Sequence, residues 1–99
     1  MTEPTPAEDT ATVERLLDYW LEDLGEREGR PATRTNAIEA RWKGGVRKLT
    51  ADEANDFDEW VRTRANVILL NPDSPEGVRY KARQDQQAVA RWLKAEGYR

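Results

Sequence analysis

Residues 49–70 read LTADEANDFDEWVRTRANVILL and combine a helix start signal with a long apolar stripe. Thr50 and Glu53 have the T-x-x-E spacing of a capping box, in which each side chain accepts a backbone N–H of the other residue. Asn71-Pro72 is a stop signal, because proline disfavours helix in the residue before it. We therefore predict a central helix from Leu49 to Leu70, with Trp60 at the centre of the core. The apolar residues of this helix recur at three- and four-residue steps and so share one side of it: Ala54, Phe57, Trp60, Val61, Ala65 and Ile68.

Three other segments carry helical patterns between polar loops. The first has the cleanest amphipathic stripe in the chain, with Thr10 or Thr12 as its N-cap and Gly25 as its C-cap. The last follows Ser74, which is a preferred N-cap residue and the only serine. In chain order, the four predicted helices span about 11–24, 35–43, 49–70 and 75–96.

The fold class predicted from these segments is all-α, a compact antiparallel bundle of four helices whose second helix is short. Residues 1–10 contain two prolines and three acids without any period, so we expect a disordered acidic N-terminal tail. Residues 11–99 form a single helical domain, because 99 residues are enough for one modest core.

The composition limits the kinds of catalytic and metal-binding site that the chain can form. The chain has no cysteine and no histidine, which excludes disulfides, thiolate or imidazole metal sites, and Cys–His or Ser–His catalysis. Asp52, Asp56 and Glu59 gather on one side of the central helix, but no second metal-binding motif accompanies them. We expect a protein that is not an enzyme and needs no cofactor or metal. No apolar run reaches membrane-spanning length and no signal peptide is visible, so we expect a cytoplasmic protein.

The net charge of −3 hides an alternation along the chain. Acids outnumber bases in residues 1–30 and 51–73, and bases outnumber acids in residues 31–50 and 74–99. Because these blocks coincide with the predicted helices, the opposite charges can neutralise one another across helix contacts or form two surfaces of opposite sign. The sequence leaves both alternatives open.

The outer face of the last helix is the predicted partner-binding site, because amides and bases surround one aromatic there. We favour a small non-enzymatic adaptor or inhibitor that binds another protein through one of its charged faces, this one first. The alternative is a nucleic-acid-associated accessory module, which the acidic composition disfavours. A ladder of acids on the first helix (Glu14, Asp18 and Glu22) is a second charged face. The predicted site residues are Tyr80, Arg83, Gln84, Gln87, Arg91 and Lys94.

Two charges fall on stripes that are otherwise apolar. Arg64 lies between Trp60 and Ile68 on the central helix, and Asp85 is equally central on the last helix. A lone buried charge is costly, so each needs a partner or a route to water. We predict that Arg64 and Asp85 form a structural ion pair, with Arg41 as a competing partner.

Three short strings give a loose resemblance to helical replication-accessory modules of bacteriophages: Tyr19-Trp20, the stretch 38–41 (IEAR) and the stretch 77–80 (GVRY). No residue role is carried over from this resemblance. Arginine outnumbers lysine 12 to 4, which is typical of GC-rich coding sequences. We therefore expect a gene of a high-GC bacterium or of one of its phages.

Overall fold

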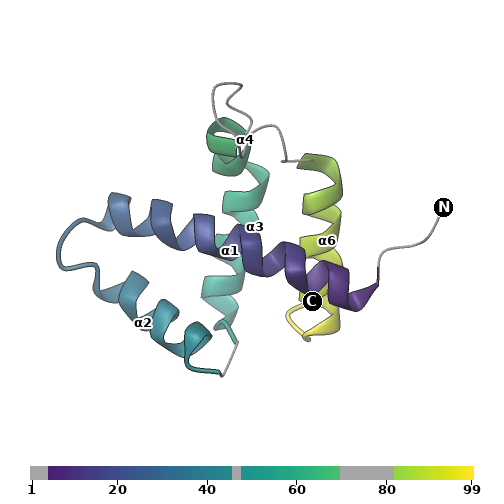
Figure 1. The fold of residues 1–99 in the computed structure, drawn as a ribbon, viewed down its shortest axis with the longest axis horizontal. Coiled ribbons are helices and arrows are strands. Elements are labelled where there is room, and N and C mark those ends of the chain that lie inside the picture. The colour runs from purple at the N-terminus through teal and green to yellow at the C-terminus, as the bar shows by residue number, and fades with distance from the viewer. Residues whose placement is uncertain (1–4, 46–47, 70–81) are drawn as a thin grey trace.

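The computed structural model describes residues 5–45, 48–69 and 82–99, without the side chains of residues 68, 69 and 82. Within this part of the chain all regular structure is helical, and no strand is present (Figure 1). The predicted all-α class and the compact arrangement of four helices are confirmed, with the central helix divided in two. The helices are α1 (Pro6–Glu28), α2 (Thr33–Lys43), α3 (Ala51–Arg62), α4 (Arg64–Leu69) and α6 (Ala82–Ala95).

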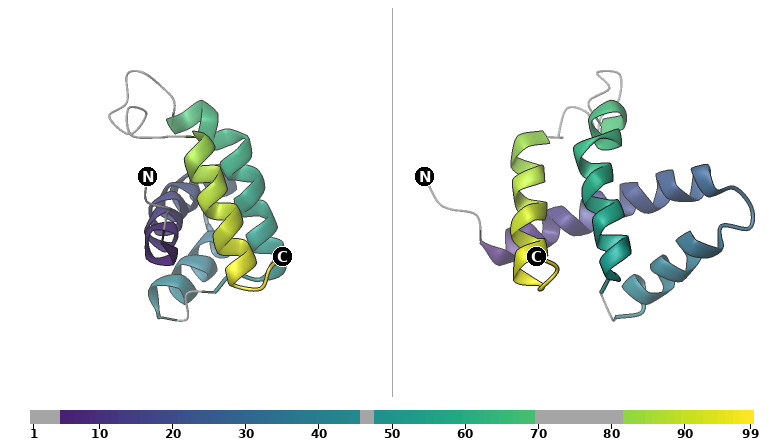
Figure 2. Two further views of the ribbon diagram at one scale, coloured as in Figure 1. Left: turned by 90° about the vertical axis from the view of Figure 1, so that its right-hand side faces the viewer. Right: turned by 180° about the vertical axis from the view of Figure 1, so that it is seen from behind.

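The helices form two layers. α3 and α6 lie side by side and run in opposite directions, and α1 crosses both of them on one face (Figure 2). α2 turns back beside the C-terminal half of α1, so these two helices form a hairpin. The predicted antiparallel arrangement therefore holds for α3 and α6, whereas α1 lies across them. This crossing lets α1 contact α2, α3 and α6 along its length.

The first helix is longer than its apolar stripe indicates. It begins at Pro6, where the Thr5 side chain accepts the backbone N–H of Glu8 at 3.2 Å and proline occupies the first turn. The prediction of a tail through residue 10 is therefore wrong for residues 6–10, and residues 1–4 lie outside the described part. Gly25 does not end the helix either, which continues to Glu28 before Gly29 at φ +80°.

The C-terminal end of α1 completes the start of α2. The carboxylate of Glu28 accepts the backbone N–H groups of Arg34 and Thr35, at 2.9 and 3.0 Å, and the Thr35 hydroxyl at 2.7 Å. It thereby replaces the local side-chain cap that α2 lacks. These bonds, that of the Thr35 hydroxyl foremost, lower the pKa of the Glu28 carboxyl.

The predicted capping box at the start of α3 is confirmed. The Thr50 hydroxyl accepts the N–H of Glu53 at 3.2 Å, and the Glu53 carboxylate accepts the N–H of Thr50 at 2.9 Å. The unbroken helix to Leu70 is wrong, because the chain departs from helical geometry at Thr63 (φ −122°, ψ −79°). The Thr63 hydroxyl donates to the carbonyl of Glu59 at 2.8 Å, a bond to the preceding turn that is known to bend helices.

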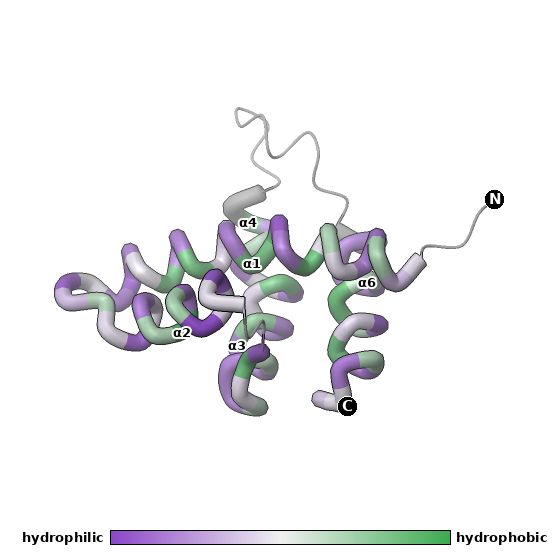
Figure 3. Tube along the Cα trace, turned by 60° about the horizontal axis from the view of Figure 1, so that its bottom comes forward, coloured by the Kyte–Doolittle hydropathy of each residue, from purple (hydrophilic) through white to green (hydrophobic). Residues whose placement is uncertain are grey.

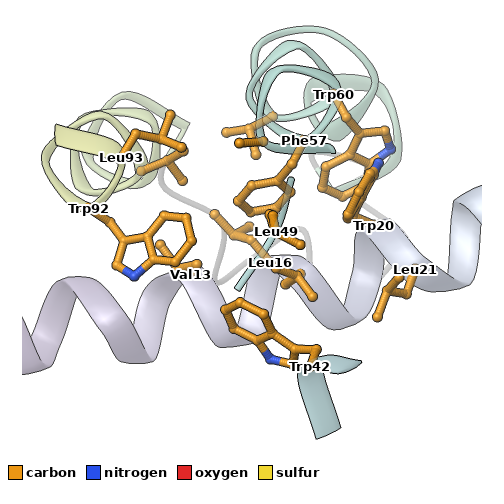
Figure 4. Close-up of a cluster of buried hydrophobic side chains, with 14 of the residues drawn as sticks. Val13, Leu16, Trp20, Leu21, Trp42, Leu49, Phe57, Trp60, Trp92 and Leu93 are labelled. Carbon is orange, nitrogen blue, oxygen red and sulfur yellow. The ribbon is translucent and has the colours of Figure 1, made fainter. Parts of the chain in front are cut away.

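The core lies where α1 crosses α3 and α6. Hydrophobic and hydrophilic positions alternate along all three helices, as amphipathic packing requires (Figure 3). Phe57 is fully buried and lies between the Trp20–Trp60 pair and the Trp92–Leu93 pair (Figure 4). Its ring centroid is 5.4 Å from that of Trp20. Trp60 is buried but lies to one side of the cluster, so Phe57 occupies the central position that we predicted for Trp60.

The C-terminal residues close the core from below. α6 ends before Gly97, whose φ of +86° favours glycine, and the chain then turns back toward the start of α3. The Tyr98 hydroxyl accepts the N–H of Leu49 at 2.8 Å and donates to the carbonyl of the same residue at 2.7 Å. The predicted start of this helix, at Pro75, lies outside the described residues. Among those residues, no helix is both long and apolar enough to cross a membrane.

Candidate functional site

The outer face of α6 is exposed, as predicted for the partner-binding site. The side chains of Arg83, Gln84, Gln87 and Lys94 face solvent, and Tyr80 lies outside the described residues. The inner face of the same helix is held in the core by Ala88, Val89, Trp92 and Leu93. The helix therefore presents polar groups from a rigid support.

Arg91 belongs to a contact inside the protein. Its guanidinium donates from Nε and Nη2 to the two carboxylate oxygens of Asp9 on α1, at 2.9 and 2.8 Å. This bond raises the pKa of Arg91. Helical phase places Arg83, Gln87 and Lys94 within about 40° of one another, with Arg91 turned toward α1. The predicted face is thus divided: Arg83, Gln84, Gln87 and Lys94 point outward, and Arg91 stabilises the α1–α6 crossing.

The predicted pair between Arg64 and Asp85 is wrong, because α1 lies across both helices and supplies a partner to each. Arg64 donates from Nε and Nη2 to Asp23, at 2.8 and 2.9 Å. Asp85 accepts a hydrogen bond from Nη2 of Arg15 at 2.9 Å. Arg41, the competing partner for Asp85, pairs with Glu53 instead.

The carboxylate of Asp23 contacts three other side chains. Besides Arg64 it accepts the indole N–H of Trp60 at 3.0 Å, and the Nε of Arg27 lies 2.9 Å away. The hydrogen bond from Arg64, opposed by burial and supported by that from Trp60, lowers the pKa of Asp23. The carboxylate thus joins α1 to α3 and α4 at the helix break.

Sequence reasoning missed Asp9 and Asp23, although a signal for both exists. Each lies one heptad from Leu16, so both fall on the apolar stripe of α1. Both are buried, at 7% and 9% exposure. The test that singled out Arg64, a charge on an apolar stripe, identifies these two acids when it is applied to α1.

Ion pairs between helices decide the question of charge alternation. The basic segment of α2 pairs with acidic α3 through Arg34–Asp56 and Arg41–Glu53. At the C-terminus, Arg99 pairs with the buried carboxylate of Asp58. Together with the pairs of α1 described above, these contacts show that the alternating charges largely neutralise one another across helix contacts.

The described residues line two hollows of interest. One, of about 300 Å³, lies between the C-terminal half of α1, the start of α2, and α3 with α4. The other side of α1 carries the acidic ladder, where Asp18, Glu39 and Lys43 line a shallow hollow of about 270 Å³. There the Lys43 ammonium pairs with Glu39 at 3.0 Å, which raises the pKa of Lys43.

The described part of the chain contains no cluster of three or more acidic side chains arranged to hold a metal ion. Of the acids on α3, Glu53 and Asp58 are buried against arginines, and Asp56 is paired with Arg34.

Comparisons with protein-family models, curated proteins and solved structures give no match.

Proposed function

We propose that this protein is a small non-enzymatic adaptor or inhibitor that binds another protein through the outward-facing residues of α6, namely Arg83, Gln87 and Lys94. One observation carries the proposal: these exposed side chains make no hydrogen bond or ion pair within the described chain, whereas the arginines of α1–α4 mostly do. The backbone of α6 is already ordered by its packing in the core, so binding through this face has only the side chains to order.

The nucleic-acid alternative has weaker support. A module that follows a phosphate backbone needs several free cations, because each neutralised phosphate contributes to affinity. The bond to Asp9 occupies Arg91, which leaves Arg83 and Lys94 as the two unpaired bases among the described residues of α6. A protein partner with one or two acidic side chains fits this surface better.

Charge reversal tests the proposal. The tagged protein is used to capture its partner from an extract of its native host, in parallel with the variant Arg83→Glu/Lys94→Glu. We expect the variant to fold normally and to lose the partner, because both side chains are exposed and contribute little to stability. The matched control is Arg30→Glu/Lys48→Glu, which changes the net charge equally on exposed residues elsewhere and should retain the partner.

Two outcomes would contradict the proposal. Equal capture by wild type and by the Arg83→Glu/Lys94→Glu variant would remove α6 as the binding surface. Binding to random DNA that falls steeply across a salt series, and that the same variant abolishes, would support the nucleic-acid alternative instead.

A further inference from the structure

The 300 Å³ hollow between α1, α2, α3 and α4, which we call the groove, lies away from the outer face of α6. Its lining is partly apolar and partly charged. Trp20, Leu24 and Trp60 contribute apolar surface from α1 and α3. Charged side chains and one hydroxyl complete the lining: Arg27, Arg34, Asp56, Glu59, Thr63 and Arg64. An apolar floor with charges around it is the usual composition of a protein-binding depression.

The positive and negative side chains around this groove are not paired one to one. Two guanidinium groups, Arg27 and Arg64, converge on one carboxylate, Asp23, which leaves an excess positive charge there. On α3, two carboxylates one turn apart, Asp56 and Glu59, have a single arginine, Arg34, as their partner. Within the described residues Glu59 has no ion-pair partner, so an excess negative charge remains beside the positive one.

The unused donors strengthen this asymmetry. Each arginine has five N–H groups. Arg64 uses two of them for Asp23, and the Nε of Arg27 lies 2.9 Å from the same carboxylate. Both side chains are about half exposed, at 44% and 47%. They are held in place by Asp23 and still offer N–H groups to an incoming carboxylate.

An apolar side chain projects beside the groove. Val67 follows the groove residue Arg64 by three positions on α4, which places the two on neighbouring sides of that short helix. It is 78% exposed and is the one large hydrophobic residue exposed in the described chain. The same molecule thus offers an apolar knob and, next to it, a groove with an apolar floor.

We propose that this face binds a second copy of the chain. In a contact with twofold symmetry, residue i of one copy meets residue j of the other, and j meets i. The positive Arg27–Arg64 side of one copy then faces the negative Asp56–Glu59 side of its partner, twice, and each Val67 approaches the groove of the other copy. The outer face of α6 stays free in both copies.

The bipolar lining is what selects this occupant. A partner segment of one charge would be repelled by one side of the groove, because like charges in contact disfavour association. A second copy carries both signs in the arrangement that a twofold axis requires. The contact is small and polar, so we expect a dissociation constant in the micromolar range or weaker, on the order of 10⁻⁵ M.

A charge exchange measured by sedimentation equilibrium tests the proposal. Wild type should show a reversible monomer–dimer equilibrium without any partner present. Arg27→Glu alone and Glu59→Arg alone should each weaken the dimer about tenfold or more, because symmetry places two like-charge contacts in each. An equimolar mixture of the two variants should restore the dimer, since every contact is then again between opposite charges. Val67→Asp should also weaken the dimer, and mixing this variant with either charge variant should not restore it.

Controls separate association from folding. Circular dichroism of every variant should show unchanged helix content, because the three altered side chains are exposed. Glu26→Arg and Arg83→Glu change exposed charges outside the groove and should leave the dissociation constant unchanged. A monomer up to about 1 mM, or a mixture that associates no better than either variant, would overturn the proposal. The outcome is independent of the α6 partner, which the experiment does not contain.

Discussion

Replacing Asp23 by alanine should be among the most damaging changes outside the apolar core. The carboxylate is the acceptor for the indole N–H of Trp60, a side chain only 3% exposed. A buried donor without an acceptor costs about 1–3 kcal/mol. The ion pairs with Arg27 and Arg64 add a smaller contribution, because both guanidiniums are about half exposed and screened by solvent. We therefore expect Asp23→Ala to lower the free energy of unfolding by about 2–4 kcal/mol.

The assay is thermal and urea unfolding, followed by circular dichroism, of Asp23→Ala, Arg64→Ala and the double variant. For a domain of this size the expected loss corresponds to a Tm lower by roughly 10–25 °C. Arg64→Ala alone should cost much less than Asp23→Ala, and almost nothing once Asp23 is gone. Asp23→Asn, which keeps an acceptor for Trp60 but not the charge, should lie between wild type and Asp23→Ala. An Asp23→Ala variant within about 0.5 kcal/mol of wild type would refute the reasoning.

Three further predictions concern other contacts. Tyr98→Phe removes the hydroxyl that bonds the backbone before α3 and should cost about 1–2 kcal/mol in urea unfolding, whereas an unchanged midpoint would show that the contact does not matter. Arg91→Ala should destabilise the protein by about 1 kcal/mol through the loss of its bidentate bond to Asp9, while Arg83→Ala on the same helix stays within about 0.5 kcal/mol; equal effects would contradict the division of the α6 face. The pKa of Asp23 is lower in the folded protein than its usual 3.8, so the unfolded chain binds more protons near that pH. The resulting stability is present above pH 3.8 and is lost as the pH falls below it, so urea midpoints of wild type should fall more steeply there than those of Asp23→Asn.

The local signals in the sequence predicted local structure well. The capping box of Thr50 and Glu53 marks the start of α3, and helical periodicity identifies the buried faces of α1, α3 and α6. Sequence signals for helix ends and breaks were less informative, because their outcome depends on which of several possible hydrogen bonds to the backbone forms. Gly25 is a typical helix stop, yet α1 continues to Glu28, whose carboxylate accepts N–H groups at the start of α2. The break at Thr63 depends on a hydroxyl bond that threonine can also omit in a regular helix.

By itself the sequence determined the helical class and the composition of the core, because periodicity and caps are properties of residues close together in the chain. The absence of cysteine and histidine is likewise read directly from the sequence. The sequence also required that a charge on an apolar stripe find a partner, since burial without one is too costly. Only the tertiary structure decided which partner. α1 crosses α3 and α6 in place of running beside them, so Asp23 reaches Arg64, Arg15 reaches Asp85 and Asp9 reaches Arg91. A crossing angle arises from the packing of whole helix surfaces, which no stretch of sequence specifies alone.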